Sequence, residues 1–255
     1  YYLAKMGEST GLPERMIMDT AIQSMGLAEL APFDLDKKVI EYAIAAKDRL
    51  VNLTVTGFID LLSTDAPAPG GGSVAALCGA MSGALSAMVA NLTVGKKDYA
   101  DVQNEVLEIA PLAQDIKLRA LNGIDADTDA FNQLMDAMRL PRKSDEEKQI
   151  RDEAIEAATQ HAILTPLETM KVSLEALHMA ERIGKVGNAN ALSDAGVAGL
   201  TALAAAKAAY YNIRINMPGV TDESFKVGTM KKADQILKEC EEIAAKLDKA
   251  MMEKL

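Results

Sequence analysis

The sequence contains no tryptophan, and aromatic residues make up only 4% of its 255 residues. Strands are enriched in β-branched and aromatic side chains, so this scarcity disfavours a sheet protein. Alanine, leucine and methionine dominate, and no segment sustains the alternation of polar and apolar residues that a half-buried strand needs. The chain is therefore predicted to be all-α, with closely packed helices.

Positive charge is also scarce, because 27 Lys and Arg face 37 Asp and Glu, giving a net charge of -10 at pH 7. Nucleic-acid binding needs a basic face that displaces counterions, so no nucleic-acid partner is expected. An anionic small molecule would need a local basic pocket. The hydrophobic share of 49% is ample for the core of one large domain or two small ones.

Only two cysteines and two histidines occur. Cys78 and Cys240 lie in separate predicted helices without metal-ligand spacing, which predicts reduced thiols in a cytoplasmic protein, with Cys78 filling the core. His161 and His178 are too far apart to form a helical ligand pair, so no metal site is expected. The chain begins at Tyr1 without a charged-then-apolar leader, so we expect a fragment or a processed form. No apolar run reaches the roughly 18 uninterrupted residues of a membrane span, and no membrane partner is expected.

Turn residues divide the chain into predicted helices. Proline is expected to kink or split two of them, at Pro111 and Pro166. Ser144 and Glu147 form the S-x-x-E pattern of a helix start. The predicted helices cover about 13–25, 36–48, 56–63, 73–94, 97–140, 144–183, 193–216 and 221–255.

The most distinctive stretch is 66–77, in which two prolines precede three glycines and an apolar helix. Ser73 is the predicted N-cap of that helix. Backbone N–H groups and the helix dipole make such a start a candidate anion site. No Lys follows the glycines and no strand precedes them, which disfavours a Walker loop and a dinucleotide fingerprint. A Gly-rich turn that merely caps a buried helix explains the residues equally well.

Three acids, Asp125, Asp127 and Asp129, are spaced two apart and therefore point in different directions on a helix. The apolar stripe of this helix includes Asp127 and leaves out the other two, so Asp127 is predicted to face inward. Burial raises the pKa of a carboxyl group, which suits general acid–base catalysis near neutral pH. The alternative is a structural carboxylate that pairs with a cation or caps a neighbouring helix.

A polar loop at 184–194 precedes another helix, and Ser193 or Asn190 is its predicted N-cap. Side-chain amides in this loop could also bind a heterocycle beside the Gly-rich loop. Arg214 lies in an otherwise apolar helix end and is the cation that most needs a partner. Cations for the candidate site are sought among Lys96, Lys97, Arg139, Arg142 and Lys143, although solvated helix ends account for them equally well.

Four patterns in one order resemble the cyclodeaminase part of the formiminotransferase-cyclodeaminase family. They are the segments 68–76, 125–131, 138–141 and 215–223. Residues 49–255 resemble the helical cyclodeaminase domain. Residues 1–48 are similar to the C-terminal tail of a formiminotransferase domain plus a linker, so a formiminotransferase domain is the expected partner in the full protein.

The resemblance implies conversion of 5-formimidoyltetrahydrofolate to 5,10-methenyltetrahydrofolate and ammonia, a step of histidine degradation. It implies a multi-helix up-and-down bundle that dimerises through its helices within a homo-oligomer, and no metal or cofactor beyond the folate. It places the proton-transferring carboxyl on Asp127. The residues it places around the folate, which can be polyglutamylated, are Pro69, Gly70, Gly71, Gly72 and Ser73, with Asn188, Asn190, Ser193 and Asp194 as weaker candidates. Arg139 is added because a polyanionic folate needs cations at the mouth of the site.

Two other interpretations remain open. A methenyltetrahydrofolate cyclohydrolase would use the same pocket to add water to the cyclised ring. A non-catalytic helical oligomerisation module would show no turnover at all.

Overall fold

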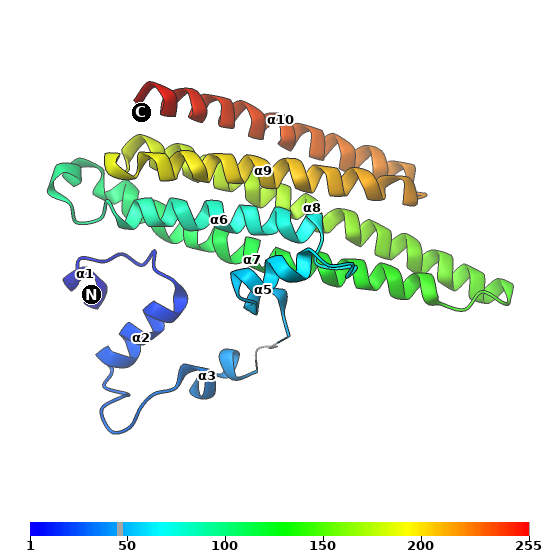
Figure 1. Ribbon diagram of the computed structural model, residues 1–255, viewed down its shortest axis with the longest axis horizontal. Helices are drawn as coiled ribbons and strands as arrows, with labels where there is room; N and C mark the ends of the chain where they lie inside the picture. The colour runs from blue at the N-terminus through cyan, green and yellow to red at the C-terminus, as the bar shows by residue number, and fades with distance from the viewer. Residues whose placement is uncertain (45–47, 255) are drawn as a thin grey trace.

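The computed structural model describes residues 1–44 and 48–254, and these contain no β-strand. Successive long helices run in alternate directions along the molecule (Figure 1). The all-α class and the up-and-down bundle are therefore confirmed. The long helices are α6 (Gly71–Asn91), α7 (Gln103–Arg139), α8 (Asp145–Val186), α9 (Leu192–Asn216) and α10 (Glu223–Lys254).

Short helices precede the bundle and lie along one side of it (Figure 1). The helix expected at 36–48 is two separate turns, and residues 45–47 of that range lie outside the described residues. The short helices are α1 (Tyr2–Lys5), α2 (Glu14–Ser24), α3 (Leu35–Lys38), α4 (Ile40–Ala43) and α5 (Val55–Leu62), and the 3₁₀ turns are η1 (Leu50–Asn52), η2 (Lys97–Val102), η3 (Ala189–Ala191) and η4 (Met217–Gly219).

Neither internal proline divides its helix. α7 continues through Pro111 and α8 through Pro166, so the expected breaks are wrong. Proline lacks an N–H and leaves the carbonyl four residues earlier without its helical partner. For Pro166 this carbonyl belongs to Ala162, and the side-chain amide of Asn216 on α9 donates to it over 3.3 Å. Packing of α9 against α8 thus compensates for the lost helical hydrogen bond.

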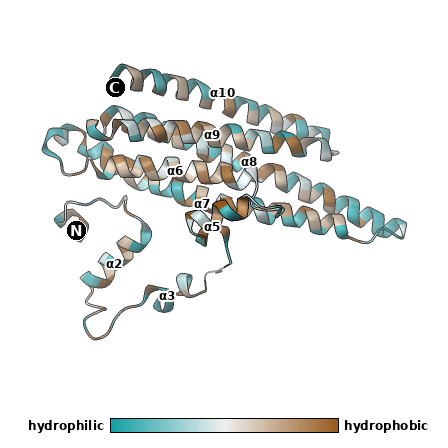
Figure 2. Ribbon diagram, viewed as in Figure 1, coloured by the Kyte–Doolittle hydropathy of each residue, from teal (hydrophilic) through white to brown (hydrophobic). Residues whose placement is uncertain are grey.

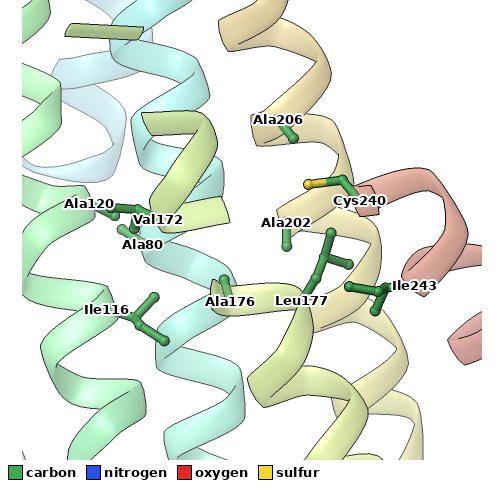
Figure 3. Packing of buried hydrophobic residues seen from close by; sticks show 10 residues of the cluster. All are labelled: Ala80, Ile116, Ala120, Val172, Ala176, Leu177, Ala202, Ala206, Cys240 and Ile243. Atoms are coloured by element: carbon green, nitrogen blue, oxygen red, sulfur yellow. The ribbon is translucent and has the colours of Figure 1, made fainter. Parts of the chain in front are cut away.

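Small side chains let the helices approach closely. Figure 3 shows alanines of neighbouring helices packed together, with Ile116, Leu177 and Ile243 filling the space between them. A Cβ on Gly83 of α6 would lie 2.8 Å from the backbone nitrogen of Lys117 on α7. The helix-forming composition therefore also sets the spacing between helices.

α6 packs against α7, α8 and α9. It is long and apolar enough to span a membrane by length and composition, although no run of this kind was expected from the sequence. The apolar window of α6 is 61% buried inside the bundle, as in the core helix of a soluble protein, so this is weak evidence for a membrane span.

Both cysteines are free thiols. Cys240 of α10 is the one that fills the core, and burial raises the pKa of its thiol to about 12. Cys78 was expected to fill the core but is only half-buried.

Candidate functional site

The helix after the Gly-rich loop begins earlier than expected. α6 starts at Gly71, and its N-cap is Gly70, which offers no side-chain cap. The predicted N-cap role of Ser73 is wrong, because Ser73 lies inside the first turn and is fully buried. Its hydroxyl points to α7, where it lies 2.9 Å from the carbonyl oxygen of Ile124 and 3.2 Å from Asp127 Oδ2.

The carboxyl group of Asp127 lies against this helix start, whose N-cap residue has no side chain to cap it. A Cβ on Gly72 would lie 1.9 Å from Asp127 Oδ1, so the glycine provides the space that the carboxyl occupies. Burial raises the pKa of Asp127, and hydrogen bonds from the side chain and the backbone of Ser73 oppose that shift. The inward orientation predicted for Asp127 is therefore confirmed, although the residue is half-buried.

The Ser73 hydroxyl can serve both protonation states of this carboxyl. A hydroxyl has one proton to donate and can also accept. With Asp127 ionised, Ser73 can donate to Oδ2; with Asp127 protonated, the acid can donate to Ser73, whose proton then turns to the carbonyl of Ile124. Both acceptors lie within 3.2 Å of Ser73 Oγ. The pair can thus take up and release a proton without leaving a buried group unpaired.

Asp125 is buried more deeply than Asp127, with 5% exposure, so the prediction that it falls off the inward face is wrong. Its carboxylate accepts hydrogen bonds from the backbone N–H groups of Leu50 (2.7 Å) and Val51 (3.2 Å) and lies 3.8 Å from Arg49 Nε. Asp125 therefore caps η1, which packs on a second face of α7. This is the structural alternative considered for Asp127, realised two residues earlier.

A cavity of about 240 Å³ opens beside Asp127, where the Gly-rich loop meets α7, α8 and α9. Pro69 of the predicted loop is buried and does not line it, while Ser73 supports Asp127 from behind. No Lys, Arg or His is among the described residues that line it. These residues are Pro67, Ala68, Gly70, Gly71, Gly72, Asp127, Thr128, Ala130, Phe131, Leu134, Ala162, Asn212, Ile215 and Asn216.

Asn212 and Asn216 were not predicted as site residues. They occupy successive turns of α9, and both side chains line the cavity together with Asp127. Two amides four residues apart share one helix face, and in such an apolar helix this spacing was the available signal.

The cations expected near the site lie elsewhere. Lys96 and Lys97 follow the far end of α6, a helix of 21 residues or roughly 30 Å. Arg139 ends α7, about three turns beyond Asp127, and its guanidinium donates to Asp136. The loop residues Arg142 and Lys143 that follow are exposed and do not line the cavity.

Arg214 was expected to need a partner, but it is exposed to solvent and does not need the ion pair that a buried cation would require. Its guanidinium lies 5.8 Å from the ring centroid of Tyr210, a cation–π distance.

The 184–194 loop does not meet the Gly-rich loop within the chain. Asn188 is buried at the opposite end of α6, donates to the carbonyl of Leu92 and accepts from the N–H of Asn190. It thus caps η3, whereas the N-cap of α9 is Ala191 rather than the predicted Asn190 or Ser193. Ser193 and Asp194 follow in the first turn of α9, at the same distant end.

A larger cavity of about 430 Å³ lies between α7 and α8. Its arginine, Arg119, is paired with Glu175 and Asp115, and His161 contacts Gln133. These groups already have partners, whereas the smaller cavity holds a carboxyl with a raised pKa. Within residues 1–44 and 48–254, no cluster of His, Cys, Asp and Glu could hold a metal ion. The Asp127 cavity is therefore the better candidate.

Comparisons with known proteins agree on one family. The sequence profile of the formiminotransferase-cyclodeaminase family matches residues 54–235. A methenyltetrahydrofolate cyclohydrolase of Methylorubrum extorquens is 39% identical over 189 residues, which cover 74% of this chain and 90% of that protein. A formimidoyltransferase-cyclodeaminase of Dictyostelium discoideum is 33% identical over 97% of this chain and 46% of its own length.

The mouse formimidoyltransferase-cyclodeaminase is 29% identical over 92% of this chain and 44% of its own length, so this chain spans less than half of both transferase-cyclodeaminases. The solved structure of a formiminotetrahydrofolate cyclodeaminase from Thermotoga maritima matches with a TM-score of 0.71 and 28% identity, covering 78% of this chain and 96% of that one. By profile, by sequence and by structure, the chain belongs to the formiminotransferase-cyclodeaminase family.

Proposed function

We propose that this chain is a formimidoyltetrahydrofolate cyclodeaminase and that Asp127 is its general acid and base. The observation that carries the proposal is the half-buried Asp127 carboxyl, which has a raised pKa and lines a cavity at the start of α6. The names of the relatives, which include two transferase-cyclodeaminases and a cyclodeaminase, support the substrate class.

The reaction needs one group that moves a proton. N10 of the folate attacks the carbon of the protonated amidine on N5, and a tetrahedral centre forms. Asp127 takes the proton from N10 and gives it to the amino group on that carbon. The carbon–nitrogen bond then breaks, ammonia leaves, and the methenyl cation keeps the charge that the amidinium brought. Holding N10 and the amidine together contributes as much as the proton transfer.

Ser73 is proposed to position the acid. Its hydroxyl is within hydrogen-bond distance of Asp127 Oδ2 and of the Ile124 carbonyl, so it can follow the carboxyl through both protonation states. The reaction needs no metal and no cofactor besides the folate.

The folate is proposed to enter the cavity with its reacting end only. Pockets that enclose a drug-sized ligand measure about 300–1,000 Å³, and this one measures about 240 Å³. The glutamate tail then lies outside the cavity. The N–H groups of Gly71 and Gly72 have no side-chain cap, so they are available to a polar edge of the pterin.

A second candidate function is the cyclohydrolase, because a relative of that name is 39% identical over most of its length. The same carboxyl would then activate water against the methenyl carbon. The transferase-cyclodeaminase alignments favour the deaminase, since they extend over 92% and 97% of this chain while the cyclohydrolase alignment covers 74%.

We also propose that the chain forms a homodimer through α6 and α9. α6 carries no charged residue, and it packs against α9, which also exposes large hydrophobic side chains. Figure 2 shows hydrophobic residues along both helices. An apolar surface of this extent is typical of an interface. Its exposed large side chains are Met81, Met88, Leu92, Val197, Leu200, Tyr211 and Ile215.

Light scattering tests the dimer. The wild-type chain is expected at twice its monomer mass, and Leu200→Glu, which places a charge at a position 61% exposed, is expected to yield folded monomer. A wild-type monomer at micromolar concentration would contradict the proposal.

The function is tested by supplying 5-formimidoyltetrahydrofolate and, separately, 5,10-methenyltetrahydrofolate. The proposal predicts equal amounts of ammonia and methenyl-folate from the first compound. Consumption of the second without ammonia release from the first would establish the cyclohydrolase. If neither compound reacts, the remaining interpretation is the non-catalytic oligomerisation module.

A further inference from the structure

Two residues with amide side chains line the same cavity as Asp127, and their roles are not explained by proton transfer. Asn212 and Asn216 come from α9, while Asp127 comes from α7. An amide can present either a donor or an acceptor to a ligand, so its orientation decides what it recognises.

The orientation of Asn216 is fixed by a proline on another helix. Pro166 has no N–H, so the carbonyl of Ala162 is left without its helical donor. Asn216 Nδ2 donates to this carbonyl over 3.3 Å and also to the carbonyl of Asn212 over 3.1 Å. Both protons of the amide nitrogen are thereby used. The oxygen is the atom that remains for the cavity.

Asn212 uses one of its two amide protons within α9. Its Nδ2 donates over 2.9 Å to the carbonyl of Ala208, one turn earlier in α9. Its amide lies over the start of α6, where a Cβ on Gly71 would be 3.5 Å from Nδ2 and 3.8 Å from Oδ1. Among the described residues, no group donates to Oδ1 of Asn212 or of Asn216.

The polar side chains of the cavity therefore consist of one carboxyl, two amides whose oxygens accept from no described residue, and the hydroxyl of Thr128. We propose that Asn212 and Asn216 are specificity residues that accept hydrogen bonds from the N–H groups of a protonated N5-amidine and disfavour a carbonyl in its place. This inference rests on the proposed function, because it names the group on N5 that the same cavity selects.

The formimidoyl and formyl groups have opposite hydrogen-bonding properties at the end of the N5 substituent. A formimidoyl group on N5 ends in nitrogen, which carries two N–H donors in its protonated form and three once the tetrahedral centre has been protonated on that nitrogen, before it leaves as ammonia. A formyl group on N5 ends in an oxygen that only accepts. Against two amide oxygens, the formyl oxygen would meet like partial charges and leave the amides unpaired, which is how a polar site rejects a near-isostere.

The test measures the affinities of two ligands, 5-formimidoyltetrahydrofolate and 5-formyltetrahydrofolate. Calorimetry on chains that also carry Asp127→Asn prevents turnover, so the preference is measured even if the chain deaminates nothing. The variants are Asn212→Ala, Asn216→Ala and Asn212→Asp. Asn104→Ala, at an exposed position in the first turn of α7, is the control, and thermal unfolding checks that each chain is folded.

The expected result is a preference for the formimidoyl compound that each alanine variant lowers by roughly 10-fold, the scale of one lost charge-assisted hydrogen bond. Asn212→Asp, which keeps an acceptor but loses the amide N–H, is expected to retain the preference. If Asn212 had only a structural role, Asn212→Ala and Asn212→Asp would be equally harmful, and Asn212→Asp would not retain the preference. The inference would be overturned if the chain with both asparagines intact bound the two ligands equally well. It would also be overturned if both alanine variants kept an unchanged preference.

Failure of the proposed function has a different signature. It would appear as absence of ammonia release by the wild-type chain, whatever the order of the two affinities.

Discussion

Glycine-containing loops flank both ends of α6, yet the two ends differ in how fully their polar groups are satisfied. At the C-terminal end, Thr93 donates to the carbonyl of Val89 and accepts from the N–H of Asn188, and Asn188 donates to the carbonyl of Leu92. At the N-terminal end, Gly70 provides no side-chain cap and the carboxyl of Asp127 has a raised pKa.

The comparison separates a structural loop from a candidate site. Where every polar group at a helix end has a hydrogen-bond partner within the protein, the end is stabilised and no polar group is left to bind a ligand. At the open end, the carboxyl and the amide oxygens of α9 surround a cavity instead of one another. The predictions below alter one end and compare it with the other.

The largest effect is expected from Gly72→Ala. The added Cβ would lie 1.9 Å from Asp127 Oδ1, so the carboxyl must move, and we expect turnover to fall about 100-fold, as for loss of a general acid–base group. Gly228→Ala on α10 is the control, because its Cβ would also meet nothing within 4 Å and Gly228 does not line the cavity. Steady-state ammonia release measures both. Similar activity in the two variants would show that the position of the carboxyl does not matter.

Ser73→Ala is expected to have a smaller effect with a definite sign. The Ser73 side chain lowers the pKa of Asp127, so its removal raises that pKa further. Because the base must be ionised to accept the N10 proton, the acidic limb of the pH–rate profile should move to higher pH. Turnover at neutral pH should fall by somewhat more than about 10-fold, the low end of the worth of one hydrogen bond to a charged group. If the acidic limb of the profile lies at the same pH as in the wild type, Ser73 has no role in the mechanism.

At the closed end, Asn188→Ala should change stability rather than turnover. It removes the side-chain bonds to Leu92 and Asn190 in a buried setting, and a loss of about 1–3 kcal/mol in the free energy of unfolding is expected. Urea unfolding and ammonia release on the same sample check both parts. A large loss of turnover in a chain that remains folded would show that this loop belongs to the functional site after all.

The smallest effect is expected from Arg139→Ala. Its ion pair with Asp136 is exposed, and such pairs contribute about 0–1 kcal/mol. Turnover and affinity for the folate should stay within about twofold of the wild type. A marked loss of affinity that depends on salt would show that the end of α7 contacts the glutamate tail.

Much of the architecture follows from the sequence by local rules. The alternating bundle and the start of α8 were predicted, and Ser144 and Glu147 form the capping box that their spacing indicates. The inward orientation of Asp127 followed from the apolar stripe of α7. These features depend on residues within one helix or one turn, and the sequence displays them directly.

The errors arise where distant segments meet. The stripe of α7 could not show that η1 packs on its other face and uses Asp125 as a cap. Pro166 predicted a break because nothing local indicates that Asn216 supplies the missing donor. The same long-range contact hid Asn212 and Asn216 as site residues, and the separation of the two polar loops depends on the length of α6.

The most direct measurement compares Asp127→Asn with Asp125→Asn on 5-formimidoyltetrahydrofolate and follows turnover and unfolding together. Asp127→Asn is expected to lose 100-fold or more in ammonia release. Because its pKa is raised in the folded state, ionised Asp127 costs stability above that pKa, so Asp127→Asn should be no less stable than the wild type at neutral pH, and any gain should vanish as the pH falls.

Asp125→Asn should show the opposite pattern, with turnover within a few-fold of the wild type and a loss of about 1–3 kcal/mol in unfolding free energy, since it weakens the cap on Leu50 and Val51. If Asp127→Asn retains full turnover, or Asp125→Asn alone abolishes it in a folded chain, the assignment of the catalytic carboxyl is contradicted.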